Sequence, residues 1–167
     1  MKKYFAITVA VCTSGCVSYY DPMLRTDKSG AVIEAATLID SSKRVDGTRV
    51  QLFYVSKVDG KEIENALNAT SKFNNGKGIA VQPIAPHRQV PANMALALEI
   101  CGETYNGAPI LDLFRADQKR CETFSRSFDP NKNYYVTGHI DQKVAVEIVD
   151  VAPVNSDEES VIWDGKY

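Results

Sequence analysis

The chain has 167 residues, of which 44% are apolar and 24% are charged. This apolar share argues against an intrinsically disordered protein, and the length suits a single domain with its own core. The 19 basic and 21 acidic residues give a net charge of −2, and neither sign forms a long block. A slightly acidic chain with scattered Lys and Arg lacks the electrostatic footprint of a nucleic-acid-binding protein.

The first fifteen residues have the three parts of a bacterial export signal. A basic head contains Lys2 and Lys3, an apolar run follows over residues 4–11, and small residues precede Cys16. The apolar run is about half the roughly 20 residues that cross a bilayer, so we expect no permanent span here. We therefore expect residues 1–15 to be a cleaved signal peptide.

Ser14 and Gly15, directly before Cys16, resemble the lipobox of bacterial lipoproteins. The resemblance implies cleavage before Cys16 and diacylglycerol on its sulfur, with a further acyl chain, such as palmitate, on the new amino group. Thr13 stands where the family usually has Leu. Cys12 fits less well because Val11 precedes it. The alternatives are a secreted protein without lipid and a buried N-terminal strand with an incidental cysteine.

Sorting in Gram-negative lipoproteins indicates the compartment. Val17, after the cysteine, is not the aspartate associated with retention in the inner membrane. The resemblance therefore implies an outer-membrane protein that faces the periplasm or the exterior, with the membrane as its partner through the acyl chains on Cys16. Cleavage would leave 152 residues with 17 basic and 21 acidic side chains, a net charge of about −4.

Cys101 and Cys121 remain after the cysteines of the signal region are set aside. An even pair in an oxidising compartment indicates a disulfide, which would stabilise a fold with this loop length by about 3 kcal/mol. A thiol metal site or a reactive thiol are the alternatives. No His lies next to either cysteine and no CxxC spacing is present, which argues against zinc.

Residues 16–30 mix polar residues with Pro and Gly, and we expect the lipidated Cys16 to be followed by a flexible tether of up to about 45–50 Å when fully extended. Residues 31–167 then form a single β-rich domain. Its first segment, residues 31–40, fits a helical stripe and a strand face about equally well, and we lean towards a helix or a poorly formed strand.

Strand and turn patterns fill most of the rest of the domain. Residues 49–55 read as a strand, with a turn at Asp59-Gly60 and one short helix within residues 61–70. A turn at residues 74–78 leads to a short strand at residues 79–81, next to Pro83 and Pro86. Residues 94–100 alternate most clearly, with Met94, Leu96, Leu98 and Ile100 on one face.

After Ile100 we expect a loop over residues 102–107 and a turn at residues 129–133. The further expected strands are residues 110–114, 121–128, 134–140 and 144–149, with a last edge strand at 161–163. Short strands at about ten-residue spacing predict a mainly β fold, an antiparallel β-sandwich or small barrel with at most one or two short helices. The disulfide would join the strand ending near Ile100 to the one that opens at Cys121.

Residues 45–150 also resemble, in architecture, the small β-sandwich domains of uncharacterised outer-membrane lipoproteins. No diagnostic motif is part of this resemblance, and it implies a fold without a function.

Residue patterns for catalysis are sparse. The chain has two histidines, His87 in an expected loop and His139 on an expected strand, and their spacing suggests no metal site. The sequence contains no Gly-x-Ser-x-Gly elbow and no phosphate-binding glycine loop. We therefore predict no catalytic residue, no metal and no cofactor.

Other residues that could carry chemistry have simpler interpretations. The dipeptides Asp46-Gly47, Asp59-Gly60 and Asp164-Gly165 read as turns. Four scattered acids are expected to contact solvent: Asp112, Asp141, Glu147 and Asp150. Of Tyr134 and Tyr135, which face opposite sides of a strand, one should line the core and the other should be exposed.

The anchor and the lack of a catalytic pattern favour a non-enzymatic envelope protein that binds or braces another component. A second envelope protein could pair with an open sheet edge. The alternative is a periplasm-facing binder of a saccharide or another small ligand in a pocket with exposed aromatic rings. A cell-wall hydrolase is the third possibility.

Overall fold

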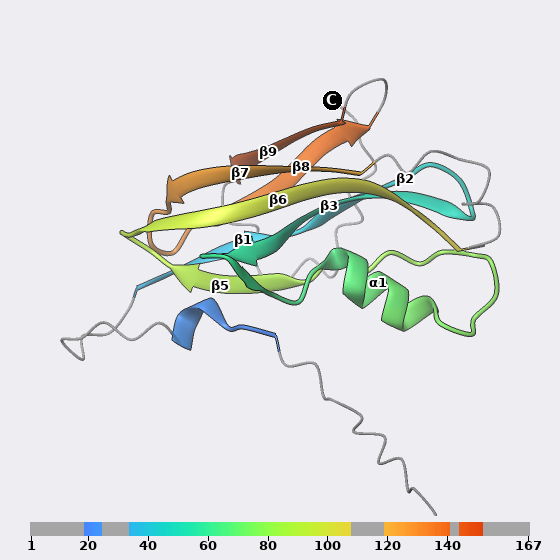
Figure 1. Ribbon diagram of the computed structural model, residues 1–167, viewed down its shortest axis with the longest axis horizontal. Helices are drawn as coiled ribbons and strands as arrows, with labels where there is room; N and C mark the ends of the chain where they lie inside the picture. The colour runs from blue at the N-terminus through green and yellow to red at the C-terminus, as the bar shows by residue number, and fades with distance from the viewer. Residues whose placement is uncertain (1–18, 25–33, 108–118, 141–143, 152–167) are drawn as a thin grey trace, which may run out of the picture.

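The computed structural model describes residues 19–24, 34–107, 119–140 and 144–151, which form two β-sheets packed face to face and one helix (Figure 1). The elements are η1 (Pro22–Leu24), β1 (Ala35–Ile39), β2 (Ser41–Arg44), β3 (Arg49–Val58), β4 (Lys61–Glu62), α1 (Ala66–Asn74), β5 (His87–Pro91), β6 (Ala95–Asn106), β7 (Lys119–Ser127), β8 (Asn133–Ile140) and β9 (Val144–Val151). The signal region, Cys16 and the strands predicted at 110–114 and 161–163 lie outside the described residues.

Two separate sheets confirm the mainly β sandwich. One has the order β5-β1-β8-β9, and the other has the order β2-β3-β6-β7 with β4 beside β3. Neighbouring strands are antiparallel except for β1 and β8, which are parallel. The sheets do not close into a barrel, the second form that the sequence allowed. Strands β3 and β6 of one sheet pack on β8 of the other, and α1 covers part of the outer face over β3.

The alternation predicted for β6 is confirmed. Leu96, Leu98 and Ile100 are fully buried between the sheets, while Ala95 and Ala97 are exposed on the outer face. The loop predicted over residues 102–107 is wrong, because β6 continues to Asn106. Its second half pairs with the first half of β3, with Arg49 opposite Asn106. Cross-strand pairing therefore overrides the local preference of Gly and Asn for turns.

Residues 35–39 form a strand, which resolves the ambiguity in the first segment of the domain. Strand β1 lies between β5 and β8 and pairs with both. Its buried side chains are Ala36 and Leu38, and not those of Ala35 and Ile39, which the strand pattern had placed together on one face. The pattern of these five residues fits a helical period as well as a strand period, and pairing with a strand on each side decides in favour of the strand.

The helix is displaced from its predicted position. Asp59-Gly60 forms the predicted turn with positive φ at both residues, and Lys61 and Glu62 then return along β3 as β4. Helix α1 therefore begins at Ala66, after the N-cap Asn65, whose side chain accepts a 3.1 Å hydrogen bond from the Asn68 backbone N–H.

The strand predicted at residues 79–81 is also wrong. Val81 is buried near α1, and its N–H donates to the carbonyl oxygen of Gly47 at 3.0 Å outside any ladder. The strand in this region is β5, which starts after Pro86. His87 is therefore on a strand and not in the predicted loop.

Residues 19–24, which are part of the expected tether over residues 16–30, lie against the domain. The Tyr20 N–H donates to the Glu62 carbonyl oxygen at 3.0 Å, and the Tyr20 side chain packs on the core between the sheets. Pro22 is buried, and η1 contacts β5. Neither helix of the described ranges is long and apolar enough to span a bilayer.

Candidate functional site

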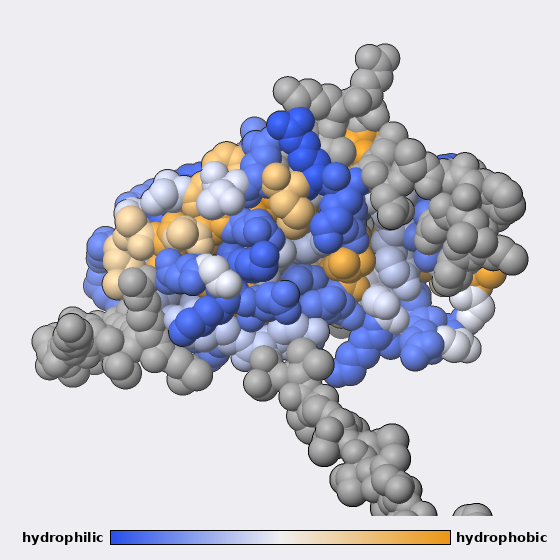
Figure 2. Space-filling view, viewed as in Figure 1, coloured by the Kyte–Doolittle hydropathy of each residue, from blue (hydrophilic) through white to orange (hydrophobic). Residues whose placement is uncertain are grey.

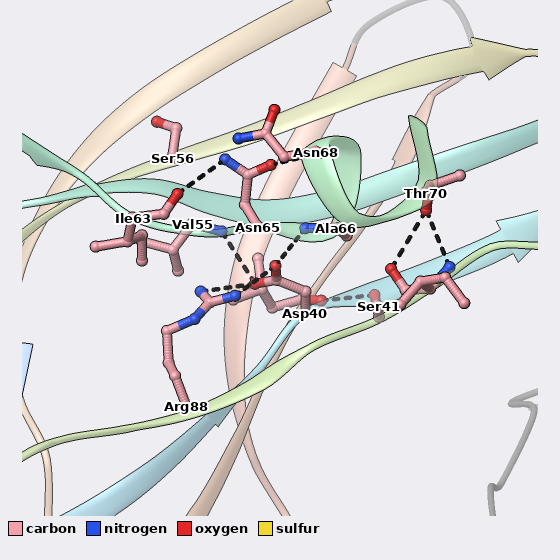
Figure 3. A network of polar contacts seen from close by, with 12 residues as sticks. Asp40, Ser41, Val55, Ser56, Ile63, Asn65, Ala66, Asn68, Thr70 and Arg88 are labelled. Atoms are coloured by element: carbon pink, nitrogen blue, oxygen red, sulfur yellow. Dashed lines mark hydrogen bonds and ion pairs between the residues drawn. The ribbon is translucent and has the colours of Figure 1, made fainter. Parts of the chain in front are cut away.

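A buried carboxylate sits where the chain passes from one sheet to the other. Asp40 lies between the end of β1 and the start of β2, and its side chain is fully buried. Both of its oxygens accept hydrogen bonds from the Arg88 guanidinium on β5, at 3.0 and 2.6 Å (Figure 3). The backbone N–H groups of Val55 and Ala66 donate to the same carboxylate at 3.2 and 2.8 Å. We call these residues the Asp40 junction.

Burial raises the pKa of Asp40 above its ordinary value of 3.8, and Arg88 opposes that shift. Arginine keeps its charge in proteins, so the junction is an ion pair. Its four donors fill the usual acceptor capacity of a carboxylate. The junction thus joins β1, β3, α1 and β5, and Asp40 has no acceptor position left for a substrate.

A surface hollow of about 460 Å³ lies on the outer side of this junction. The segment Tyr19–Met23 forms one wall, and the residues before α1 and at the start of β5 form the other. Arg88, which lines the hollow, also reaches Asp40. The remaining residues of the second wall are Ile63, Glu64, Pro86, His87 and Gln89.

A second hollow of about 340 Å³ adjoins the first, because Tyr19 and Glu64 line both. It extends along α1 to Asn68, Ser71 and Lys72. Two tyrosine rings, carboxylates and amides can recognise a small hydroxyl-rich molecule, with the rings covering its apolar face. We regard the two hollows together as the candidate binding site.

The Cys101–Cys121 disulfide is formed, as the sequence predicted. The two cysteines lie directly opposite each other on β6 and β7, with Cα atoms 4.1 Å apart. Among the described residues, they and Glu99 are the one group of three potential metal ligands whose ligand atoms converge within 4.8 Å. The bonded sulfurs leave no thiolate to hold an ion.

Glu99 has its own protein partners in this group. Its carboxylate accepts a hydrogen bond of 2.6 Å from the Ser56 hydroxyl and one of 3.1 Å from Lys57. These bonds, the one from Ser56 foremost, lower the pKa of Glu99. Glu99 is therefore a charged side chain that is held by two residues of the neighbouring strand β3.

The structure does not bring the sequence-predicted polar residues together. His87 and His139 are both exposed, on β5 and β8 of the same sheet but separated by β1. Asp150 pairs with Lys132 at 3.2 Å, and Glu147 is exposed. Asp112, Asp141 and Asp164-Gly165 lie outside the described residues.

The predicted tyrosine arrangement is present on β8. Tyr134 is buried and meets the Phe128 ring edge-on at 4.8 Å, whereas Tyr135 is partly exposed. Asp46-Gly47 lies in a turn, as predicted, where the Asp46 carboxylate accepts hydrogen bonds from Thr48 and Arg49. These bonds, the Thr48 N–H first, lower the pKa of Asp46 to about 2.

Sequence reasoning missed Asp40, Arg88 and Glu64 as site residues. Asp40 and Arg88 are 48 positions apart and belong to no motif, so their pairing depends on the fold alone. The one local signal was an acid at the end of an apolar run, which is common at strand ends. Comparison with protein-family models, with curated proteins and with solved structures found no match.

Proposed function

We propose that the chain is a lipid-anchored protein of the bacterial cell envelope whose domain has a non-enzymatic binding or structural role. The observation that carries the proposal is the order of residues at the start of the chain. Lys2 and Lys3 precede an apolar run, and Ser14-Gly15 precedes Cys16. Each buried acyl methylene contributes about 0.8 kcal/mol, so two or three chains on Cys16 would make release very slow.

The disulfide supports export, because such bonds persist in oxidising compartments such as the periplasm. It joins Cys101 and Cys121 within one sheet, where it supports the fold. Val17 after the acylated position favours the outer membrane.

Two features support a binding or bracing role. The Asp40 carboxylate is saturated by protein donors, which favours a structural use of this buried charge. In the described part of the chain, β7 and β9 are the last strands of their sheets, on the side of the molecule away from α1 (Figure 1). An edge strand of this kind can pair with a strand of another envelope protein.

Membrane fractionation of two serine variants tests the anchor. Cys16→Ser should move the protein from the membrane to the soluble fraction. Cys12→Ser, the matched control four residues earlier, should leave it with the membrane. Release by Cys12→Ser, or retention of Cys16→Ser, would refute acylation at Cys16.

The two hollows favour a second candidate function, the binding of a small saccharide. Tyr19 and Tyr20 line the first hollow, and Glu64 lines both hollows. Calorimetric titration with soluble cell-wall saccharides should show binding that Glu64→Gln weakens, while Glu122→Gln on β7 leaves it unchanged. Equal affinities in both variants would refute this site.

A further inference from the structure

The described part of the chain begins close to the predicted acylation site. Cys16 and Tyr19 are three peptide units apart, and consecutive Cα atoms are about 3.8 Å apart, so their Cα atoms lie within about 11 Å of each other. If Cys16 is acylated as proposed above, the lipid is attached at a residue whose Cα lies within that distance of Tyr19. Covalent geometry thus excludes a long spacer between the acyl chains and the domain.

Tyr19 is part of a segment that is held to the domain. The backbone bond from Tyr20 to Glu62 joins this segment to β4, and Lys61 Nζ lies 4.4 Å from the centre of the Tyr20 ring. Pro22 is buried, and η1 contacts β5. The anchor is therefore coupled to one particular side of the sandwich, the side that carries η1, β5 and α1 (Figure 1).

That side carries aromatic rings beside lysines. Tyr19 is 39% exposed and lines the second hollow together with Lys72. Phe73 on α1 is 36% exposed, and Lys77 Nζ lies 3.3 Å from the centre of its ring. Figure 2 shows hydrophobic residues between hydrophilic ones over α1 and at the loop beyond it, where Ile79 is 62% exposed.

We propose that this side, which we call the α1 face, rests on the phospholipid headgroups of the membrane that the acyl chains enter. The α1 face consists of Tyr19, Tyr20, Lys61, Lys72, Phe73 and Lys77. Tyr and other aromatic rings favour the headgroup depth of a bilayer, and lysines extend an ammonium towards phosphate.

The acids beside these residues define the kind of headgroup. Glu62 follows Lys61 on β4, Glu64 lines the second hollow together with Lys72, and Asp21 lines the first hollow, so three acids offset the three lysines of the α1 face. A surface with both signs suits a zwitterionic headgroup such as phosphatidylethanolamine, whose phosphate and ammonium can meet lysines and carboxylates respectively. The α1 face orients the domain but does not anchor it, so the Cys16→Ser protein is still released.

Lysine footprinting of the acylated protein on vesicles of phosphatidylethanolamine and phosphatidylglycerol tests this orientation. A membrane-impermeant amine reagent should modify Lys72 and Lys77 severalfold more slowly on vesicles than in the released Cys16→Ser protein. Lys132, whose ammonium pairs with Asp129 and with Asp150 on β9, should react equally in both. A flexible Gly-Ser insertion between Ser18 and Tyr19 should restore much of the reactivity of Lys72 and Lys77.

The outcomes separate the two proposals. A protein that floats with the vesicles but shows no protection at Lys72 and Lys77 would overturn the orientation and leave the anchor intact. Equal protection of Lys132 would also overturn it. A purified protein that carries no acyl chain and does not float would overturn the proposed anchor itself.

Discussion

Between the two sheets, Leu96, Leu98 and Ile100 are buried in an apolar cluster, whereas at one corner of the same sandwich Asp40 is buried as a charge beside the partly exposed Arg88. The first region is stabilised by apolar surface that is removed from water, and a substitution there lowers the stability in proportion to the side-chain volume that is lost. The second depends on a complete set of partners, because an unpaired buried charge is far more costly than a small cavity. The comparison indicates that the polar corner is the more fragile of the two.

The largest effect is expected at the Asp40 junction. Arg88→Met should lower the free energy of unfolding by about 3–5 kcal/mol, because it leaves a buried carboxylate without its countercharge. Urea unfolding of the released Cys16→Ser protein measures this. The double variant Asp40→Asn/Arg88→Met should recover part of the loss. A single variant within about 0.5 kcal/mol of the parent would show that the junction is dispensable.

The stability that Arg88→Met loses should depend on pH. Arg88 lowers the pKa of Asp40, so its removal raises the folded-state pKa further above the ordinary 3.8. An acid whose folded pKa is raised contributes most below its unfolded pKa and loses that contribution as pH rises through the folded value. The deficit of Arg88→Met should therefore be largest at neutral pH and shrink towards pH 3.8.

A cavity in the apolar core should cost somewhat less. Leu98→Ala should lower the free energy of unfolding by about 3–4 kcal/mol, with little dependence on pH. Ala97→Ser, the neighbouring residue on the exposed outer face, is the matched control and should change stability by less than about 0.5 kcal/mol. Similar losses in both variants would contradict the assignment of the two faces of β6.

The disulfide connects β6 and β7 at the far edge of the same sheet. Replacement of Cys101 and Cys121 together by serine should lower the free energy of unfolding by about 3 kcal/mol in the chain-entropy model. Thiol titration of the native protein provides the second check. Two free thiols there would contradict the disulfide.

A smaller effect is expected at the end of α1, where the Asn74 side chain bonds the backbone of Gln82, a residue that belongs to no strand. The Asn74 amide donates to the carbonyl oxygens of Thr70 and Gln82 and accepts from the Gln82 N–H. Asn74→Ala should therefore cost about 1–2 kcal/mol. Asn75→Ala, at the exposed neighbour, is the control. Equal stability of the two variants would show that the bonds to Gln82 contribute nothing.

Local patterns in the sequence predicted the parts of the fold that local forces decide. The alternation of β6 and the Asp59-Gly60 turn are of this kind, whereas the pairing of Cys101 with Cys121 followed from the number of cysteines left after the signal region. Strand β1 could not be distinguished from a helix, because five residues fit both periods until β5 and β8 lie beside them. Strand β5 was missed because two prolines precede it.

The candidate site was less accessible to prediction than the sheets. Asp40 meets Arg88 across 48 positions, and the hollow exists because Tyr19–Met23 folds back on β5. Neither event leaves a periodic signal. The Pro and Gly content of residues 16–30 suggested a spacer, although a buried proline and the Tyr20 ring hold part of it to the domain.

Intact-mass spectrometry of the protein purified from envelope membranes tests the anchor most directly. We expect a polypeptide that begins at Cys16 and is heavier than its sequence by a diacylglycerol group, with or without a further acyl chain. A polypeptide that still begins at Met1, or one that begins at an unmodified Cys16, would contradict the account.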